Sequence, residues 1–243
     1  MPVVKRPENL KQNNPNGEII VIITEQLSGY IKSFEPDLPG YLSKIENYGI
    51  NNEVPIIKKD AQSVLRFMIK TLKPIRILEI GTAIGFSACY MAEYMPYDAE
   101  IYTIEKVPAR IEVAKKNFSE SKFRDRIHLL EGDAAEILKN LAEEGKEFDF
   151  VFLDAAKAQY NVYLEYINIL LKKDGVLLTD NILQEGSVAD SKFSITRRDR
   201  TIHQRMREYI SGLMNSNMYH SMIIPIGDGM LISYKNFGGS DDK

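Results

Sequence analysis

The sequence predicts a doubly wound α/β fold, and two patterns indicate it. Five short apolar segments between residues 76 and 179 alternate with segments of helical periodicity, which is typical of a mostly parallel sheet covered by helices on both faces. Two further apolar segments, 218–225 and 230–234, flank a turn that contains Gly227 and Gly229 and so read as a hairpin. We therefore expect a mostly parallel seven-stranded sheet with an antiparallel last strand and an N-terminal helical extension.

The individual elements follow from the same periodicities. The expected parallel strands are residues 76–80, 101–104, 127–130, 148–153 and 175–179. The expected helices between them are residues 82–95, 108–121, 134–144 and 159–171, and a last helix at 199–214 precedes the hairpin. Before Pro74, apolar residues recur at helical spacing in the segments 18–34, 38–48 and 58–72, which predicts the helical extension.

Length and composition restrict the kind of protein. The 243 residues fit one domain, which we place at residues 18–243, after a polar, proline-containing segment at 1–17 that we expect to be a flexible arm. The net charge of −3 indicates no general affinity for polyanions. The single cysteine, Cys89, excludes an intrachain disulfide and is expected in the core. The N-terminal residues do not resemble a signal peptide and no apolar run could cross a membrane, so we expect a cytoplasmic protein.

Acidic residues follow four of the expected strands. These are Glu105, Asp133, Asp154 and Asp180, and the first strand ends in a turn with Gly81 and Gly85. In open α/β sheets, ligands bind beyond the carboxyl ends of the strands, where glycines permit close approach and a carboxylate can bind a ribose. The turn lacks the G-x-G-x-x-G spacing of dinucleotide sites. An NAD-dependent oxidoreductase and a non-catalytic nucleotide-binding module are therefore only distant alternatives.

Oxygen ligands follow two strands that should be neighbours in the sheet. Asp154 follows the strand 148–153, and Asp180 with Asn181 follows the strand 175–179. Each residue alone is compatible with an ordinary turn cap. Two carboxylates and an amide carbonyl together form a hard ligand set that suits Mg²⁺ or Mn²⁺. Lys157 follows shortly after Asp154, so a metal site with a nearby lysine is favoured.

The first turn also resembles a known motif. The segment 79–85, Glu-Ile-Gly-Thr-Ala-Ile-Gly, resembles motif I of the class I S-adenosylmethionine-dependent methyltransferases, and the resemblance covers about residues 50–235. It implies that Gly81 and Ser87 bind the methionine end of S-adenosylmethionine and that Glu105 binds the ribose hydroxyls. It further implies that Asp133 and Ala134 flank the adenine and that Ile57 lies over the cofactor.

The segments that contain Asp154, Lys157 and Asp180 resemble the catechol and caffeoyl-CoA type of O-methyltransferase. The resemblance implies that Asp154, Asp180 and Asn181 bind the metal, with Asp154 also close to the cofactor. It places Lys157 and Asp154 at the reacting hydroxyl. A bound divalent cation lowers the pKa of a hydroxyl and directs it. Lys157 then either accepts the proton or stabilises the oxyanion electrostatically.

The acceptor is indicated by a narrower resemblance. Residues 152–160, 179–183 and 224–230 resemble the bacterial tRNA 5-hydroxyuridine methyltransferases, which make 5-methoxyuridine at the wobble position. O4 and O5 of 5-hydroxyuridine are vicinal, as a chelating acceptor requires. Basic residues follow the metal segment and are available for phosphates: Lys192, Arg197, Arg198, Arg200, Arg205 and Arg207. A small catechol-like substrate is the alternative to tRNA, and we expect a homodimer.

Overall fold

The computed structural model describes residues 25–191, 193 and 195–236. Its contacts divide the chain into residues 1–36 and 37–243, and each unit is treated by itself. In the first unit, helix α1 comprises Glu25–Lys32, within the helix expected at 18–34. The expected arm at residues 1–17 lies outside the described residues. A single domain that begins at residue 18 stays a prediction.

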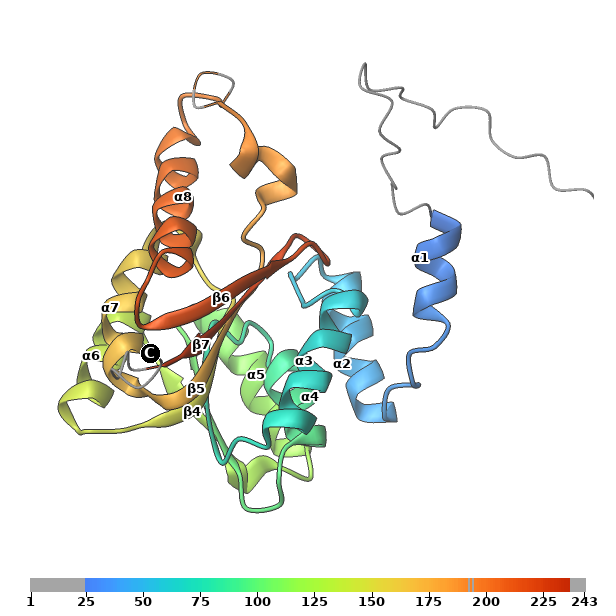
Figure 1. Cartoon of the computed structure of the whole chain (residues 1–243). Helices are drawn as coiled ribbons and strands as arrows, with labels where there is room; N and C mark the ends of the chain where they lie inside the picture. The colour runs from blue at the N-terminus through green and yellow to red at the C-terminus, as the bar shows by residue number, and fades with distance from the viewer. Residues whose placement is uncertain (1–24, 192, 194, 237–243) are drawn as a thin grey trace, which may run out of the picture. The chain divides into compact units, whose positions relative to one another are not determined.

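A seven-stranded sheet forms the centre of the second unit (Figure 1). Its order is β3-β2-β1-β4-β5-β7-β6, in which β7 runs antiparallel to both of its neighbours and the other pairs are parallel. The predicted fold class is therefore confirmed. The strands are β1 (Arg76–Ile80), β2 (Glu100–Glu105), β3 (Ile127–Glu131), β4 (Phe148–Leu153), β5 (Leu171–Thr179), β6 (Tyr219–Ile224) and β7 (Met230–Lys235).

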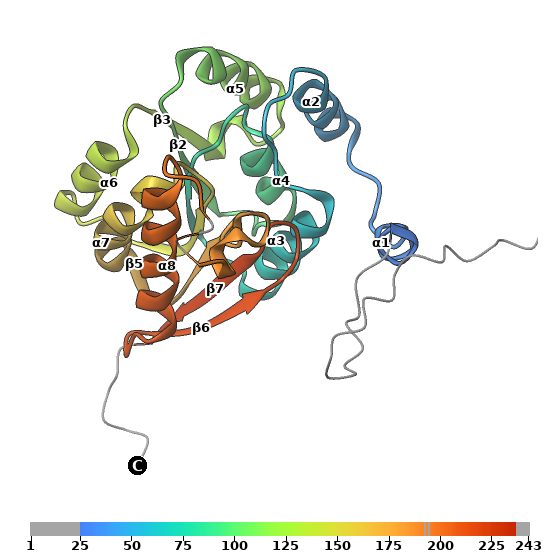
Figure 2. The ribbon, with the colours of Figure 1, turned by 90° about the horizontal axis from the view of Figure 1, so that it is seen from above.

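Helices cover both faces of this sheet (Figures 1 and 2). One face is covered by α2 (Gly40–Asn51), α3 (Lys59–Leu72), α4 (Phe86–Tyr94) and α5 (Pro108–Glu120). The other is covered by α6 (Ala134–Glu143), α7 (Tyr160–Leu170) and α8 (Arg200–Met214). Three short 3₁₀ turns complete the described part: η1 (Arg124–Arg126), η2 (Lys157–Gln159) and η3 (Gln184–Ala189).

The strand side chains alternate between two cores, as a period of two requires. Ile77 and Phe150 belong to the core under α2–α5, whereas Leu78 and Val151 belong to the core under α6–α8. Cys89 is fully buried in the first core, as expected. Among the helices of the described residues, none has both the length and the apolar character needed to cross a bilayer.

Two boundaries in the second unit differ from the prediction by four residues, and the other differences there are smaller. Helix α4 begins at Phe86 and not at residue 82, because residues 81–85 form a loop in which Gly81, Ala83 and Gly85 have positive φ. A Cβ at Gly81 would lie 2.2 Å from the carbonyl oxygen of Asp154, so this loop passes directly against the end of β4. Strand β5 begins at Leu171, earlier than residue 175, because Leu171 pairs with Phe148 across a register shift.

Candidate active site

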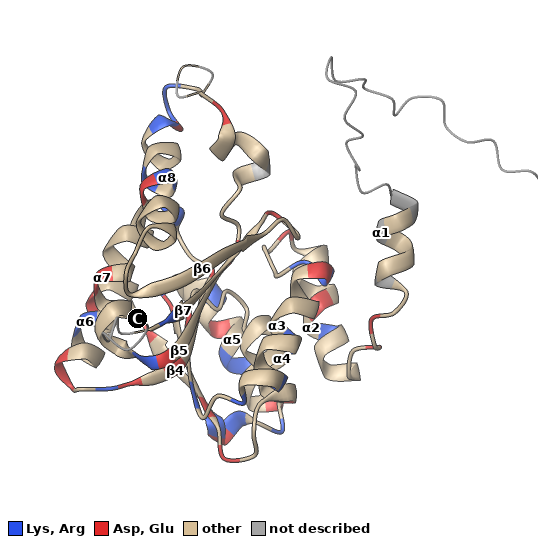
Figure 3. Cartoon of the chain, in the orientation of Figure 1, with Lys and Arg blue, Asp and Glu red and all other residues tan. Residues whose placement is uncertain are grey.

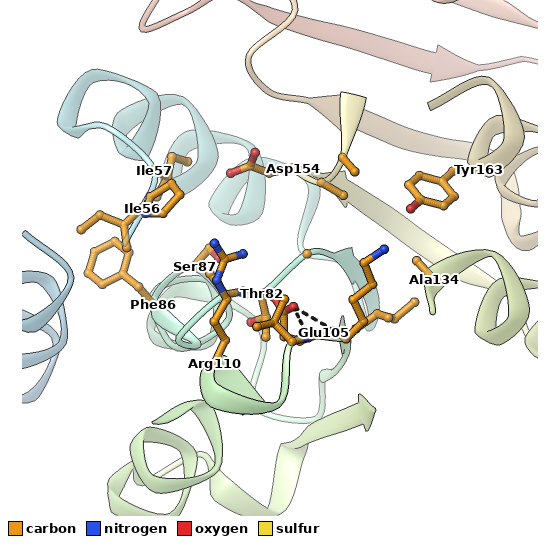
Figure 4. A pocket seen from close by; sticks show the side chains of 18 of the residues that line it. Ile56, Ile57, Thr82, Phe86, Ser87, Glu105, Arg110, Ala134, Asp154 and Tyr163 are labelled. Carbon is orange, nitrogen blue, oxygen red and sulfur yellow. Dashed lines mark hydrogen bonds between the residues drawn. The ribbon is translucent and has the colours of Figure 1, made fainter. Parts of the chain in front are cut away.

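A cavity of about 330 Å³ opens at the carboxyl ends of β1, β2 and β4 (Figure 4). We call it the first cavity. Figure 4 shows Ile57 and Phe86 on one side of it and Ala134 and Tyr163 on the other. The predicted cofactor residues that line it are Ile57, Gly81, Ser87, Glu105, Ala134 and Asp154. The fold thus gathers residues from five separate segments of the chain around one space.

Glu105, at the end of β2, is fixed by backbone amides. Its Oε2 accepts a hydrogen bond from Ala83 N at 2.9 Å, and its Oε1 accepts from Lys106 N and Val107 N, also at 2.9 Å. The carboxylate is 6% exposed. Because a carboxylate offers about four acceptor positions, three backbone bonds leave capacity for a ligand in the cavity. Glu105 therefore orders the glycine loop and presents a carboxylate at the same time.

Asp133 follows β3 beside the first cavity and caps a helix. It is the N-cap of α6, where its Oδ1 accepts from Ala135 N at 3.0 Å, and Lys106 Nζ lies 3.5 Å from its Oδ2. Its neighbours Gly132 and Ala134 line the first cavity, but Asp133 itself does not. Its side chain is used for capping, which satisfies an otherwise unpaired amide of the helix.

Glu79 interacts with Thr82 and Ser87 of the first cavity and was not among the predicted site residues. It is fully buried in β1, and Thr103 Oγ1 donates to its Oε2 at 2.5 Å. Burial raises the pKa of Glu79 to about 7, although the nearby hydroxyls of Ser87, Thr103 and Thr82 oppose this shift. The signal in the sequence was a glutamate within an otherwise apolar strand, since a buried carboxylate without a structural ion pair is unusual.

A second cavity, of about 220 Å³, adjoins the first and contains the predicted metal ligands. Asp154, Asp180 and Asn181 line it, together with Lys58 and Asp228, and Asp154 also lines the first cavity. Asn181 Nδ2 donates to Asp154 Oδ1 at 3.1 Å, and Asn181 N donates to Asp180 Oδ1 at 2.7 Å. The prediction that the ends of β4 and β5 meet is confirmed.

The electrostatics of this second cavity favour a cation. Burial raises the pKa of Asp180 to about 7, and the negative charges of Asp154 and Asp228 add to the shift. Burial also raises the pKa of Asp154, against the hydrogen bond from Asn181 and the charge of Lys157. Within the described residues no three His, Cys, Asp or Glu side chains form a metal-binding group. A cation in the second cavity would instead take two carboxylates and the amide oxygen of Asn181. This set of oxygen ligands fits Mg²⁺ or Mn²⁺.

Lys157 is paired with a residue that the prediction did not include. Its Nζ lies 3.4 Å from Oδ2 of Asp228, in the turn between β6 and β7. This turn packs tightly, because a Cβ at Gly229 would lie 2.2 Å from Leu183 Cγ. Lys157 and Asp228 line a third cavity of about 430 Å³, and Asp228 also lines the second. The lysine thus lies in the wall of the third cavity, and its partner lies in the walls of both.

The comparisons with known proteins agree with this geometry. Residues 35–236 match a protein family described as O-methyltransferase. The chain belongs to this O-methyltransferase family. It is 32% identical over 127 residues to the catechol O-methyltransferase of Niastella koreensis, a match that covers 52% of this chain and 58% of that relative. It is 28% identical over 179 residues to the caffeoyl-CoA O-methyltransferase of Populus kitakamiensis, covering 71% of this chain and 75% of that one.

A solved structure extends the likeness to nearly the whole O-methyltransferase chain. The SAH-bound methyltransferase PaMTH1 of Podospora anserina superposes with a TM-score of 0.79 at 27% identity, covering 91% of this chain and 100% of that one. This family membership favours a methyltransferase over the NAD-dependent alternative. The sequence matches to the two catechol O-methyltransferases, from Niastella koreensis and Mycobacterium tuberculosis, span only 58% and 62% of those relatives.

Proposed function

We propose that this O-methyltransferase transfers the methyl group of S-adenosylmethionine to a hydroxyl that has a vicinal oxygen, with a divalent cation bound nearby. The observation that supports this most directly is the position of Asp154. It lines both the first cavity and the acidic second cavity. A donor in the first and an acceptor in the second would therefore meet at this residue.

The first cavity has the features that the donor needs. Gly81 keeps the loop open beside the end of β4, and Ser87 lies in the first turn of α4, where helix amides favour a carboxylate. We assign these two residues to the methionine end and Glu105 to the ribose diol. Ile57, Ala134 and Tyr163 offer apolar surface for a purine. We do not assign a direct adenine contact to the Asp133 side chain, because it caps α6.

The second cavity has the features that a chelated acceptor needs. We assign the cation to Asp154, Asp180 and Asn181. The side-chain amide of Asn181 now points its nitrogen at Asp154, so the amide must rotate to offer its oxygen to the cation. When bound, the cation lowers the pKa of the acceptor hydroxyl. Lys157 lies within reach of the same region and either accepts the hydroxyl proton or stabilises the oxyanion. In the transfer, the S–CH₃ bond breaks as the O–CH₃ bond forms, and S-adenosylhomocysteine leaves.

The acceptor class best supported is a small catechol-like molecule. The matched relatives are named as catechol and caffeoyl-CoA O-methyltransferases. The second and third cavities, of about 220 and 430 Å³, together suit one substituted ring, since pockets for small ligands begin at about 300 Å³. A catechol offers the two adjacent oxygens that replace two waters of a hexacoordinate cation.

One observation favours a second candidate, 5-hydroxyuridine in tRNA. Arg197 and Arg198 are exposed before α8 and form no ion pair within the described part of the chain, and basic residues continue along α8 (Figure 3). They are therefore available for phosphates. The other basic residues fit less well. Arg200, Arg205 and Arg207 donate to backbone carbonyls of Ile195, Ala158 and Val188, and Lys192 lies outside the described residues.

The homodimer is also part of this proposal. Apolar side chains on α2 and α3 are exposed, with Tyr48 at 43%, Ile50 at 64% and Phe67 at 66%. Exposed apolar side chains on adjacent helices are typical of protein interfaces. Sedimentation velocity with wild type and with Phe67→Glu tests it. A monomer in both would remove the dimer from the proposal.

The decisive experiment compares acceptors with one preparation of enzyme, S-adenosylmethionine and Mn²⁺ or Mg²⁺. Mass spectrometry of the products should show one methyl group added to catechol and none added to phenol, which cannot chelate. Incubation of tRNA that contains 5-hydroxyuridine, followed by nucleoside analysis, tests the second candidate. Methylation of phenol and catechol at equal rates in excess EDTA would contradict cation assistance. Methylation of the tRNA without methylation of catechol would make 5-hydroxyuridine in tRNA the acceptor in place of a catechol-like molecule.

A further inference from the structure

His203 is buried in α8 without a hydrogen-bond partner. Its side chain is 3% exposed, and neither Nδ1 nor Nε2 has a partner within the described part of the chain. Leaving a buried polar group unsatisfied costs free energy, and folded proteins generally contain few such groups. An imidazole with two free nitrogens therefore indicates a partner that binds from outside the chain.

Its neighbours on α8 do not have this property. Met206, Tyr209 and Leu213 share the buried face of the helix with His203 and pack into the core under α6–α8. Tyr209 is also polar, and its hydroxyl is 2.6 Å from Thr179 Oγ1. His203 lies on the same face but is not part of that core cluster. It lines the third cavity and also a wider hollow of about 1380 Å³ along α8.

The third cavity shares the wall residue Asp228 with the proposed acceptor site. Asp228 lines both the second and the third cavity, and its partner Lys157 also lines the third. An acceptor whose two oxygens face Asp154 and Asp180 would thus pass the Lys157–Asp228 pair and present its far side to His203. Ile195 and Ile202 add apolar surface to this cavity, which suits the face of a ring.

The charges around the third cavity define the group that fits there. Two carboxylates line it: Asp228, which is paired with Lys157, and Asp199, whose Oδ2 accepts from Thr196 Oγ1 at 2.6 Å. The single ammonium is already paired, so an added anion would meet excess negative charge. An imidazole ring offers hydrogen-bonding nitrogens at two positions, which match a carbonyl, amide or hydroxyl.

We propose that His203 is a specificity-determining residue that binds a neutral polar substituent of the acceptor ring, beyond Lys157 from the methylated hydroxyl. This inference rests on the proposed function, because it assumes that the acceptor occupies the second cavity. It adds the chemical class of the distal group, which is an uncharged hydrogen-bonding group and not a carboxylate or phosphate.

The test compares catechol with 3,4-dihydroxybenzamide and 3,4-dihydroxybenzoate in wild type, His203→Leu and His203→Gln. Wild type should prefer the benzamide over catechol by about 2- to 10-fold in kcat/KM, the range of one net hydrogen bond, mainly through KM. His203→Leu should remove this preference and leave catechol nearly unchanged, and His203→Gln should restore part of it. Thr201→Val, at an exposed position of the same helix, is the matched control and should behave as wild type.

A second readout needs no turnover. Without ligands, His203→Leu should raise Tm by about 2–4 °C, since it removes two unsatisfied buried nitrogens. A lower Tm in both His203→Leu and His203→Gln would show that the imidazole is structural and would overturn the inference. An undiminished preference for the benzamide in His203→Leu, or a wild-type preference for the benzoate, would overturn it as well. In those cases catechol is still methylated, so the proposed function survives. If the proposed function itself fails, no diol is methylated, and calorimetry with S-adenosylhomocysteine and Mn²⁺ detects no diol binding. The inference would then fall with the proposed function.

Discussion

The ammonium group of Lys157, in the wall of the third cavity, pairs at 3.4 Å with Asp228, which lines both the second and the third cavity. The two side chains come from distant parts of the chain, η2 after β4 and the turn before β7. The side chains of this pair are 30% and 11% exposed, so the cost of desolvating the two charges offsets part of their attraction. The pair holds the lysine within electrostatic reach of Asp154, one of the two carboxylates that we propose as cation ligands.

The first prediction concerns this pair. Lys157→Met should lower kcat by about 10²–10⁴-fold, the usual range for a general acid or base. Asp228→Asn should lower kcat by about 10-fold, because the lysine remains but is less well positioned. Stopped-flow or steady-state methylation of catechol measures both. Equal losses in the two variants would show that Asp228 has a role of its own, and an unchanged kcat in Lys157→Met would remove the lysine from the chemistry.

The second prediction concerns the cation. Asp180→Asn should weaken Mn²⁺ binding by about 100-fold or more, because it removes one of two carboxylate ligands. Calorimetric titration with Mn²⁺ measures this directly, without turnover. Asp125→Asn, on the exposed turn η1, is the matched control and should bind Mn²⁺ as wild type does. The cation proposal fails if wild type itself takes up no Mn²⁺ and keeps full activity in EDTA.

The third prediction separates two acidic residues that the sequence treated alike. Glu105→Ala should weaken S-adenosylhomocysteine binding by about 10- to 100-fold, because it removes charge-assisted hydrogen bonds and releases the loop at Ala83. Asp133→Ala should lower the free energy of unfolding by about 1 kcal/mol through loss of the α6 cap. Its affinity should stay within about twofold of wild type. Equal affinities in the two variants would contradict this division.

The fourth prediction concerns pH and Glu79. Its pKa in the folded chain is about 7, above the ordinary value of 4.5, because of burial. Between these values the folded state binds more protons than the unfolded state, so the free energy of unfolding falls as pH rises through this window. Glu79→Gln should therefore stabilise the ligand-free protein relative to wild type at about pH 8, on the order of 2 kcal/mol, and much less at about pH 5. Urea unfolding at both pH values measures this, and a difference independent of pH would contradict it.

The fifth prediction tests the arginines for tRNA. If tRNA is the acceptor, Arg197→Ala with Arg198→Ala should weaken its binding and reduce the slope of log affinity against log salt by about one unit for each lost phosphate contact. Lys139→Ala, an exposed cation on α6, should leave the slope unchanged. Catechol kinetics should not respond to either variant. An unchanged salt slope in the double variant would show that the arginines are only a solvated surface.

The sequence was sufficient for the most deeply buried central strands, because burial imposes a pattern that local residues reveal. The ranges of β1 and β4 were predicted without error, and both strands are buried on two faces. The start of α4 was wrong because the helical pattern from residue 82 does not reveal that Gly81 approaches Asp154. That contact belongs to the tertiary structure and has no local signal.

The residues of the candidate site also fall into those that the sequence could predict and those that it could not. Residues at strand ends, such as Asp154 and Asp180, could be predicted, since topology alone brings the strand ends together. Asp228 and His203 could not. Their place depends on how the last hairpin and α8 pack against the loops after β4 and β5, which leave no periodic signal in the sequence.

The position of Asp154 in the walls of two cavities also has a thermodynamic consequence. One carboxylate that faces both spaces makes their occupancies mutually dependent. If the cation changes the affinity of the methyl donor by some factor, the donor must change the affinity of the cation by the same factor. Titrating the cation before the donor, or the donor before the cation, therefore forms a closed thermodynamic cycle. The measured factor gives the coupling free energy between the two cavities, which is favourable if binding in one strengthens binding in the other and unfavourable if it weakens it.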